Sequence, residues 1–267
     1  GMLIGLITYL AGGRYLPKSN AISVETSGTA ERGPAPLATY ILLLSVIAIV
    51  VVFRASYEQS GNTVALWADS GVDRHVGSHF SIPMTWFQSL NPMIIFMFTP
   101  IIVLYWQRAA RRGREPGSIS KMSLGAFIVG ASYLLLAAVA QSAGGERASW
   151  LWLAFYFLIY TIGELFILPV GLGLFGRLAP PAFAATAIAA WFMASFFGNL
   201  AAGVLGALWS SVSQAAFFAI TGGVGILSGL LLLVLSPWAK RVEAASMSAA
   251  ATEAELNTAA LAADSRH

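Results

Sequence analysis

Long apolar stretches separated by short polar segments dominate the pattern of this chain. Six such stretches cover roughly residues 38–68, 83–106, 121–141, 150–175, 182–209 and 214–237. A bilayer core about 30 Å thick requires about 20 apolar residues in a helix, so each stretch is long enough to cross a membrane. The pattern predicts an all-α, polytopic membrane protein whose six-transmembrane-helix bundle occupies residues 38–238.

The segments outside the bundle carry other signals. Residues 1–13 are apolar but too short to span, and we interpret them as the end of a truncated transmembrane helix. Residues 14–37 are rich in Pro, Ser, Thr and Gly, which predicts a cytoplasmic linker. Residues 239–267 are rich in Ala and Glu and predict a cytoplasmic tail, in part a frayed helix. We therefore expect a fragment of a longer protein.

Composition agrees with a membrane protein and narrows the chemistry. The chain is 57% hydrophobic and 10% charged, whereas a soluble domain usually has about 25% charged residues. It contains no Cys, which excludes disulfides and thiolate metal sites. Its three His residues lie outside the apolar stretches, and no nucleophile or phosphate-loop motif occurs. We expect no enzymatic activity, no metal and no cofactor.

Basic residues are distributed unequally between alternate loops. One set of loops holds Arg14, Lys18, Arg32, Arg108, Arg111, Arg112, Arg114, Lys121, Arg177, Lys240 and Arg241. The other set holds only Arg74 and Arg147. The positive-inside rule assigns the richer set, and with it the C-terminus, to the cytoplasm. We expect an inner (plasma) membrane protein, and because topology accounts for the basic charge, we expect no nucleic-acid partner.

Three charged residues lie well inside the apolar stretches: Arg54, Glu58 and Glu164. Arg54 and Glu58 are four residues apart, so on a helix they lie on one face, about one turn from each other. Such a carboxylate can also become neutral by taking up a proton, which is the requirement for a proton-coupling group. A purely structural ion pair that fixes the rotation of the helix is the alternative, and the spacing leaves both open.

Glu164 has no basic neighbour within a helical turn. Its partner therefore has to come from another helix, from a substrate amine or from a proton. Pro169 and nearby glycines interrupt the same helix, and broken or bent helices beside an intramembrane charge are typical of transporter binding sites. A structural interhelical pair or a protonated, hydrogen-bonded Glu164 is the alternative.

Four uncharged polar or aromatic residues are further candidates. Gln88 and Asn91 are three residues apart beside Pro92, and two amides on one helical face can recognise a peptide backbone or cap a kinked helix. Trp191 and Ser195 are four residues apart on a later span and can line the same cavity. Aromatic packing is the alternative for Trp191.

Three segments carry a resemblance to a known family. They are YEQSGNTVALWAD (57–69), WFQSLNP (86–92) and GELFILPVGLGLFGRLAP (163–180). In order and spacing they resemble the proton-dependent oligopeptide transporter family of the major facilitator superfamily, and the likeness extends over nearly the whole chain to about residue 240. The resemblance implies the C-terminal six-helix bundle of such a transporter, with a missing N-terminal six-helix half as its partner.

The resemblance also implies roles for individual residues. Glu58 matches the residue tied to proton coupling, Glu164 the one that receives the peptide amino terminus, and Asn91 a residue near that amine. Trp191 matches a pocket aromatic, and Asp69 matches an acidic residue of the external gate whose basic partner would lie on the missing half. The implied partners are di- and tripeptides, protons and the lipid bilayer.

The chain departs from the family pattern at two places. Arg54 stands where an aromatic residue is usual, and LPVGLG (168–173) lacks two hydroxyl groups of the common motif. Two other interpretations therefore stay open. The first is transport of another solute, such as nitrate or a small metabolite, on the same scaffold; the second is a membrane scaffold that does not transport.

Overall fold

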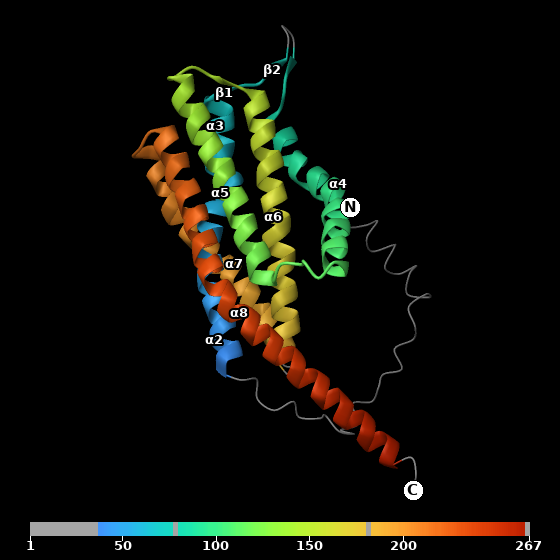
Figure 1. Ribbon diagram of the computed structural model, residues 1–267. Helices are drawn as coiled ribbons and strands as arrows, with labels where there is room; N and C mark the ends of the chain where they lie inside the picture. The colour runs from blue at the N-terminus through green and yellow to red at the C-terminus, as the bar shows by residue number, and fades with distance from the viewer. Residues whose placement is uncertain (1–36, 77–79, 180–182, 265–267) are drawn as a thin grey trace, which may run out of the picture. The chain divides into compact units, whose positions relative to one another are not determined.

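The structure is a computed structural model, and it describes residues 37–76, 80–179 and 183–264. Within them the chain is almost entirely helical (Figure 1). The expected truncated helix at residues 1–13 and nearly all of the expected linker at 14–37 lie outside the described residues.

Long helices and very short strands make up the described part. The helical elements are α2 (Leu37–Tyr57), η1 (Glu58–Ser60), α3 (Thr63–Ser70), α4 (Met84–Arg111), α5 (Ser118–Ala143), α6 (Trp150–Leu178), α7 (Ala184–Gly206), η3 (Ala207–Ser210) and α8 (Gln214–Asp264). The strands are β1 (Val72–Asp73), β2 (His75–Val76), β3 (Phe80–Ser81) and β4 (Ala148–Ser149). β1 pairs in parallel with β4, and β2 pairs antiparallel with β3.

The described residues contain six helical segments long and apolar enough to cross a membrane. This confirms the predicted all-α class. The first segment, Leu37–Ser70, combines α2, η1 and α3. The last helix, α8, passes through Pro237 without a break and reaches Asp264, so it includes most of the tail that was expected to be helical in part. The Ala- and Glu-rich sequence beyond Pro237 consists of strong helix formers, which explains the continuation.

Glycines bring the backbones of three helices together. A Cβ atom on Gly125 of α5 would lie 2.6 Å from the carbonyl oxygen of Gly163 of α6. A Cβ on Gly130 of α5 would lie 2.9 Å from the carbonyl oxygen of Gly222 of α8. Helices in lipid associate largely through such close contacts of small residues. α5 is thereby held between α6 and α8, and Figure 1 shows the three side by side.

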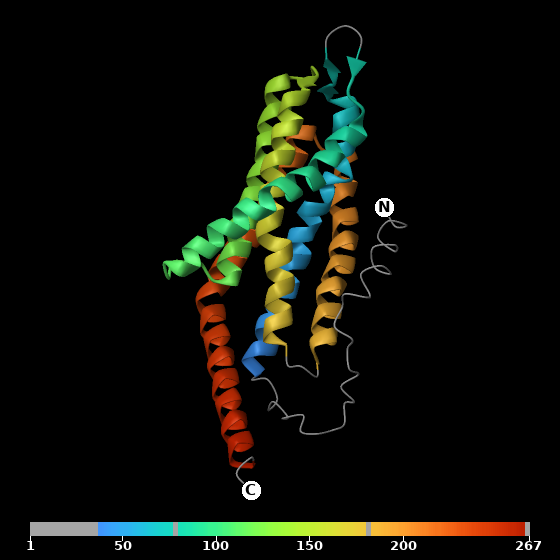
Figure 2. The same ribbon diagram turned by 90° about the vertical axis from the view of Figure 1, so that its right-hand side faces the viewer.

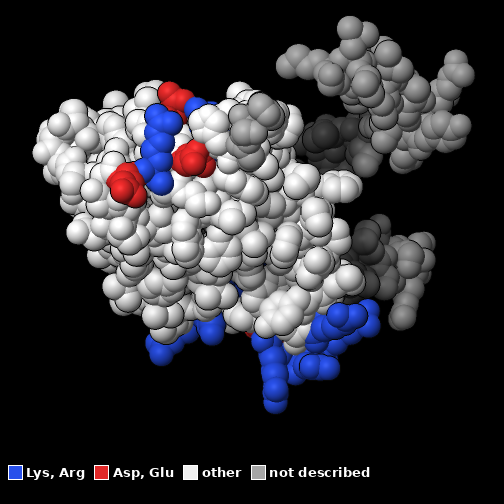
Figure 3. Space-filling model, turned by 90° about the horizontal axis from the view of Figure 1, so that it is seen from above, with Lys and Arg blue, Asp and Glu red and all other residues white. Residues whose placement is uncertain are grey.

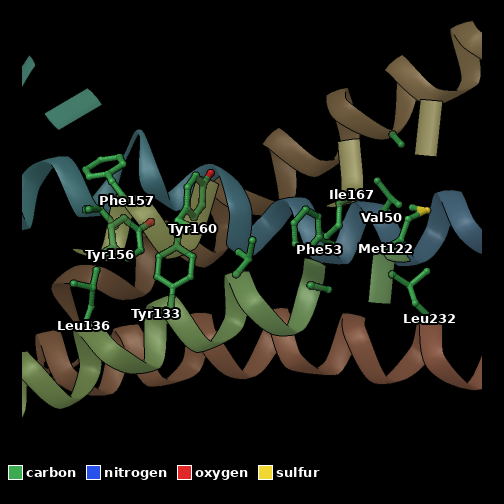
Figure 4. Packing of buried hydrophobic residues seen from close by; sticks show 14 of the residues in the cluster. Val50, Phe53, Met122, Tyr133, Leu136, Tyr156, Phe157, Tyr160, Ile167 and Leu232 are labelled. Atoms are coloured by element: carbon green, nitrogen blue, oxygen red, sulfur yellow. The ribbon is translucent and has the colours of Figure 1, made fainter. Parts of the chain in front are cut away.

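One face of each helix supplies the core. On α2 the fully or almost fully buried apolar side chains are Leu42, Val46, Val50 and Phe53, which recur at helical spacing. Figure 4 shows Val50 and Phe53 with Met122 and Ile167 along the bundle, and an aromatic group of Tyr133, Tyr156, Phe157 and Tyr160 beyond them. Aromatic side chains therefore fill the bundle beside the point where α2 ends.

Two helices contribute little to this core. α4 packs against α6, lies inclined to the other long helices (Figure 2), and buries only Phe87 and Ile94. α7 packs mainly on α2 and also exposes most of its large apolar side chains. Apolar faces of this kind suit a membrane protein, where lipid or another helical bundle covers them.

Charged side chains are confined largely to the two ends of the bundle. Figure 3 looks onto the molecule from above, where a few acidic and basic side chains lie together on a mostly uncharged surface and basic side chains gather along one margin. The end where α5 begins, which we call the basic end, carries Arg108, Arg111, Arg112, Arg114, Lys121, Arg177, Lys240 and Arg241. The opposite end carries the four strands.

Candidate functional site

The candidate site lies where α2 passes into η1, beside α4 and α6. Glu58 is the first residue of η1, so the chain tightens from an α-helix to a 3-10 turn at this charge. Gln88 and Asn91 lie in the first two turns of α4, and Glu164 lies in the middle of α6. The Gly163–Gly125 contact fixes the height of Glu164 against α5.

Two neutral donors from other helices hold the Glu164 carboxylate. The Tyr57 hydroxyl donates to Oε1 over 2.7 Å, and the Asn91 side-chain amide donates to Oε2 over 2.6 Å. The same amide lies 3.3 Å from the Thr161 hydroxyl, which itself donates to the Phe157 carbonyl. Of the sources considered for a partner of Glu164, the structure therefore supplies other helices, α2 and α4.

Glu164 is buried, with 9% of its surface exposed. Among the described residues no Lys, Arg or His side chain comes within 4.0 Å of its carboxylate. Tyr57 and Asn91 are its hydrogen-bond donors among the described residues. A cation that reaches the carboxylate would form stronger, charge-assisted hydrogen bonds than these two neutral donors.

Arg54 and Glu58 form the expected ion pair. Arg54 Nη1 donates to Glu58 Oε1 over 2.6 Å, and the exposed fractions of the two side chains are 13% and 30%. The Arg54 guanidinium also lies 5.7 Å from the centre of the Tyr57 ring. Its Nε atom is buried and has no hydrogen-bond partner among the described residues. The pair is thus partly screened from water, and the second carboxylate oxygen of Glu58 takes no part in it.

A cavity of about 260 Å³ opens between these elements. Glu58, Gln88 and Asn91 line it together, so the structure brings together three of the candidates from the sequence. The remaining described lining comes from Tyr57, Ser60, Gly61, Phe157 and Tyr160. Glu164 is not among the lining residues: it lies behind Tyr57 and Asn91, which contact both the cavity and its carboxylate.

Trp191 and Ser195 lie apart from this cavity. Trp191 is buried and packs on Gly171, whose Cβ would lie 2.1 Å from the Trp191 ring, and on Phe175, with ring centres 5.3 Å apart. Ser195 is half-buried on the same helix, α7. Neither residue belongs to the described lining. Packing thus accounts for Trp191 in this structure, and a role of either residue in substrate binding stays a prediction.

Asp69 has a basic partner within this chain. Asp69 Oδ1 accepts a hydrogen bond from Arg74 Nη2 over 2.6 Å, and the expected pairing with a basic residue of the missing half stays a prediction. The chain reverses after α3 and brings Arg74 back over the end of that helix, where its Nη1 also donates to the Ile82 carbonyl. Asp69 itself remains exposed.

Sequence reasoning missed two tyrosines of the site. Tyr57 donates to Glu164, and its carbonyl accepts hydrogen bonds from Tyr160 over 2.9 Å and from Tyr133 over 3.4 Å. The rings of Tyr57 and Tyr160 stack at 5.2 Å with an interplanar angle of 18°. Tyrosines are common in membrane proteins, so their identity alone gave no signal. Tyr156 and Tyr160 follow one another at one-turn spacing on the same helical face as Glu164, and this spacing could have indicated that Tyr160 lies near the site.

Comparison with known proteins identifies the family of this chain. Residues 34–222 match the profile of the POT family. The chain is 37% identical over 189 residues to a di-/tripeptide transporter of Lactococcus lactis subsp. cremoris, an alignment that covers 69% of this chain and 38% of that protein. It is 36% identical over 173 residues to the peptide transporter YePEPT of Yersinia enterocolitica, covering 64% of this chain and 33% of that protein. The chain therefore spans less than half the length of these relatives.

Solved structures of POT family transporters superpose on this chain. The peptide transporter POT in complex with sulfate superposes with a TM-score of 0.71 at 26% identity, covering 90% of this chain and 47% of that one. A POT family transporter in complex with a thioalcohol-conjugated peptide superposes with a TM-score of 0.69 at 26% identity, covering 76% and 42%. These proteins are transporters and not enzymes. With a family match over more than half of its residues, this chain belongs to the POT family of membrane peptide transporters.

Proposed function

We propose that this chain is the C-terminal half of a proton-coupled di- and tripeptide symporter, working with an N-terminal six-helix half in the inner membrane. The observation that carries the proposal is Glu164: a buried carboxylate in the middle of a membrane-spanning helix, held by two neutral donors, with no described cation beside it. The names of the relatives, di-/tripeptide transporter and peptide transporter, support the substrate class.

Glu164 would bind the peptide amino terminus. An ammonium group brings three donors and a full positive charge, so it forms charge-assisted hydrogen bonds that are stronger than those of a phenol or an amide. Asn91 already contacts the carboxylate and would orient the same amine. Gln88, on the cavity surface, would take the first peptide group, because an amide side chain both donates and accepts.

Glu58 would exchange the driving proton, with Arg54 as its partner in the resting state. Removing a carboxylate from water favours its neutral form, whereas a guanidinium beside it favours the charged form. Glu58 lines the cavity and its side chain is 30% exposed, so a proton can reach it from there. A proton arriving at Glu58 would release Arg54, and departure of the proton would restore the pair.

Alternating access would rock this bundle against the N-terminal half around the site near the middle of the membrane. The basic end and the C-terminus would then face the cytoplasm, as the distribution of Lys and Arg favours. Asp69, exposed at the strand end, would take part in the external gate, and Trp191 and Ser195 would meet the peptide when the cavity extends toward α7.

The test uses the full-length transporter that contains this chain, reconstituted in proteoliposomes with an inward proton gradient. Uptake of labelled dialanine is expected to collapse when a protonophore is added. Glu164→Gln is expected to lower peptide affinity by a factor of at least about 100, since losing a charge-assisted pair costs about 3 kcal/mol. Near-normal saturable uptake by Glu164→Gln would remove this residue from the binding site.

Two further arms separate the alternatives. Glu58→Gln is expected to lose uptake driven by the gradient but to keep exchange of peptide for peptide, which requires no net movement of protons. Failure of di- and tripeptides to compete for uptake, while nitrate or another metabolite competes, would assign the scaffold to another solute. Loss of stability with no change in uptake in both Glu variants would indicate structural pairs only.

A further inference from the structure

We propose that Tyr57 is the positioning residue that couples the occupancy of Glu164 to the Arg54–Glu58 ion pair. The inference rests on the proposed function, since it concerns how the peptide site and the proton site communicate. It assigns that communication to one side chain, whose two ends contact the two sites.

Tyr57 touches both sites directly. Its hydroxyl donates to Glu164 Oε1 over 2.7 Å, and its ring lies under the Arg54 guanidinium at 5.7 Å. Glu58 is the next residue in the chain. A shift of the phenol therefore changes the surroundings of the substrate carboxylate and of the ion pair at the same time.

The backbone and the ring of Tyr57 are both held by neighbouring tyrosines, so a shift of the side chain changes these contacts. The hydroxyls of Tyr160 and Tyr133 both donate to the Tyr57 carbonyl, and the Tyr160 ring stacks on the Tyr57 ring. Figure 4 shows the Tyr133 and Tyr160 side chains pointing toward one another from α5 and α6. When the phenol leaves Glu164, either its ring moves away from Arg54 and Tyr160, or the junction of α2 and η1 moves with it.

Peptide binding supplies a reason for the phenol to leave. Tyr57 and Asn91 stand between the cavity and Glu164, which is not part of the cavity lining. An ammonium that reaches the carboxylate from this cavity competes with the Tyr57 hydroxyl for Oε1, and its charge makes it the stronger donor. The displaced ring then loosens Arg54 from Glu58 and favours a proton on Glu58. Because coupling between two sites is reciprocal, a proton on Glu58 favours peptide at Glu164 to the same extent.

Few other groups compete for this role. The titratable and charged groups facing Glu58 and Glu164 in the described structure are Arg54, Tyr57, Tyr133, Tyr156 and Tyr160. α4 contributes the amides of Gln88 and Asn91 to the cavity, and α7 carries no charged residue. Of the tyrosines, Tyr57 alone hydrogen-bonds to either carboxylate among the described residues.

Tyr57→Phe tests the proposal, because it removes the bond to Glu164 and keeps the ring beside Arg54. In the full-length transporter, the KM for dialanine is measured at pH 5.5 and 7.5 together with peptide exchange. The wild-type KM is expected to rise with pH by at least about fivefold, the lower range of ordinary coupling. In Tyr57→Phe the KM itself is expected to change, because Tyr57 lines the cavity, but peptide is still bound and the ratio of the KM at pH 7.5 to the KM at pH 5.5 is expected to fall to less than about twofold.

Tyr156→Phe is the matched control. It removes a buried hydroxyl one turn from Tyr160 that hydrogen-bonds to neither carboxylate, so the pH dependence of KM is expected to stay as in wild type. Tyr160→Phe is the second variant, because it removes the shorter of the two hydrogen bonds to the Tyr57 carbonyl without touching Glu164, and it is expected to weaken the pH dependence in part. If Tyr57→Phe does not fold, the pH dependence of KM in Tyr160→Phe tests the proposal in its place.

The outcomes are separable. A wild-type pH dependence of KM in Tyr57→Phe, or in Tyr160→Phe where only that variant folds, overturns the proposal. Complete loss of peptide binding by folded Tyr57→Phe at both pH values also overturns it, since the phenol would then only build the peptide site. Failure of the proposed function has a different signature, because the wild-type protein itself would then show no uptake of dipeptide.

Discussion

Gly125 and Gly163 touch through their main chains. The Gly163 carbonyl oxygen lies 2.6 Å from the position of a Cβ on Gly125, and the Gly125 carbonyl oxygen lies 2.8 Å from that of a Cβ on Gly163. Real Cβ atoms do not approach backbone this closely, so only glycine fits on both sides. The contact lies one residue before Glu164, and the packing of α5 on α6 therefore sets the position of the candidate binding carboxylate.

Gly163→Ala is expected to lower the free energy of unfolding by about 1–3 kcal/mol, because the added methyl group forces α5 and α6 apart. The measurement is equilibrium unfolding of the protein in detergent micelles. Gly173→Ala is the control in the same helix, where a Cβ meets nothing within 4 Å. It is expected to be neutral or slightly stabilising. Equal stability of the two variants would show that the close contact is not needed.

Gln59 and Gln88 illustrate how burial separates a structural amide from a binding one. Gln59 is fully buried and donates to the Ala202 carbonyl of α7 over 2.8 Å, while its oxygen accepts from Thr63. Gln88 is exposed on the cavity. We expect Gln59→Ala to cost about 1–3 kcal/mol of stability, since the buried Ala202 carbonyl loses its side-chain donor and the Thr63 hydroxyl keeps only its longer bond to the Gln59 main-chain carbonyl.

Gln88→Ala serves as the counterpart of that variant. It is expected to leave the unfolding free energy within about 0.5 kcal/mol of wild type, and to raise the KM for dipeptide if Gln88 binds the peptide group. Unfolding in detergent should therefore detect the loss of Gln59, and uptake kinetics should detect the loss of Gln88. A destabilised Gln88→Ala with unchanged KM would reverse the assignment.

Apolar length alone was sufficient to predict the class of the fold. Helical spans need continuous apolar sequence, and few other folded segments do, so the positions of the six spans follow from the hydrophobic pattern. The rarity of charge within them likewise singled out Arg54, Glu58 and Glu164. The i,i+4 spacing predicted the Arg54–Glu58 pair correctly, because neighbours on one helix depend only on local geometry.

Contacts between helices were harder to foresee, because they depend on rotation and on short turns. Trp191 packs on Gly171 because α7 is turned toward the later part of α6, a rotation that no local pattern encodes. Asp69 finds Arg74 because the segment after α3 doubles back within five residues. Tyr57 reaches Glu164 across 107 positions of sequence, and neither residue type nor spacing indicates that bond.

Asp69 and Arg74 are expected to contribute unequally to stability, although they form one ion pair. Asp69 is 76% exposed, and exposed ion pairs contribute about 0–1 kcal/mol, so Asp69→Asn should change stability very little. Arg74 is 19% exposed and also binds the Ile82 carbonyl, so Arg74→Ala should cost more. Thermal unfolding of both variants and of the double variant checks the order. An Asp69→Asn variant as unstable as Arg74→Ala would give the carboxylate a structural role instead of a freedom to change partners at a gate.

Ser118 joins three helices at the basic end. Arg177 Nη2 of α6 donates to the Ser118 hydroxyl over 2.7 Å, and that hydroxyl donates to Glu243 Oε2 of α8 over 3.3 Å. Ser118 is buried at the first turn of α5, and Glu243 Oε1 has no hydrogen-bond partner among the described residues. Removing the hydroxyl would leave both charged side chains without their shared partner.

Ser118→Ala is therefore expected to cost about 1–3 kcal/mol and to loosen α8 beyond Pro237, where Glu243 is its contact with Ser118. Hydrogen exchange of residues 238–245 should speed up relative to residues 225–235, which remain packed on α5. Ser45→Ala is the control, because the half-buried Ser45 hydroxyl binds, among the described residues, only the Ile41 carbonyl of its own helix. Unchanged exchange beyond Pro237 in Ser118→Ala would mean that apolar packing alone, through residues such as Ala239 and Val242, holds this part of α8 to the bundle.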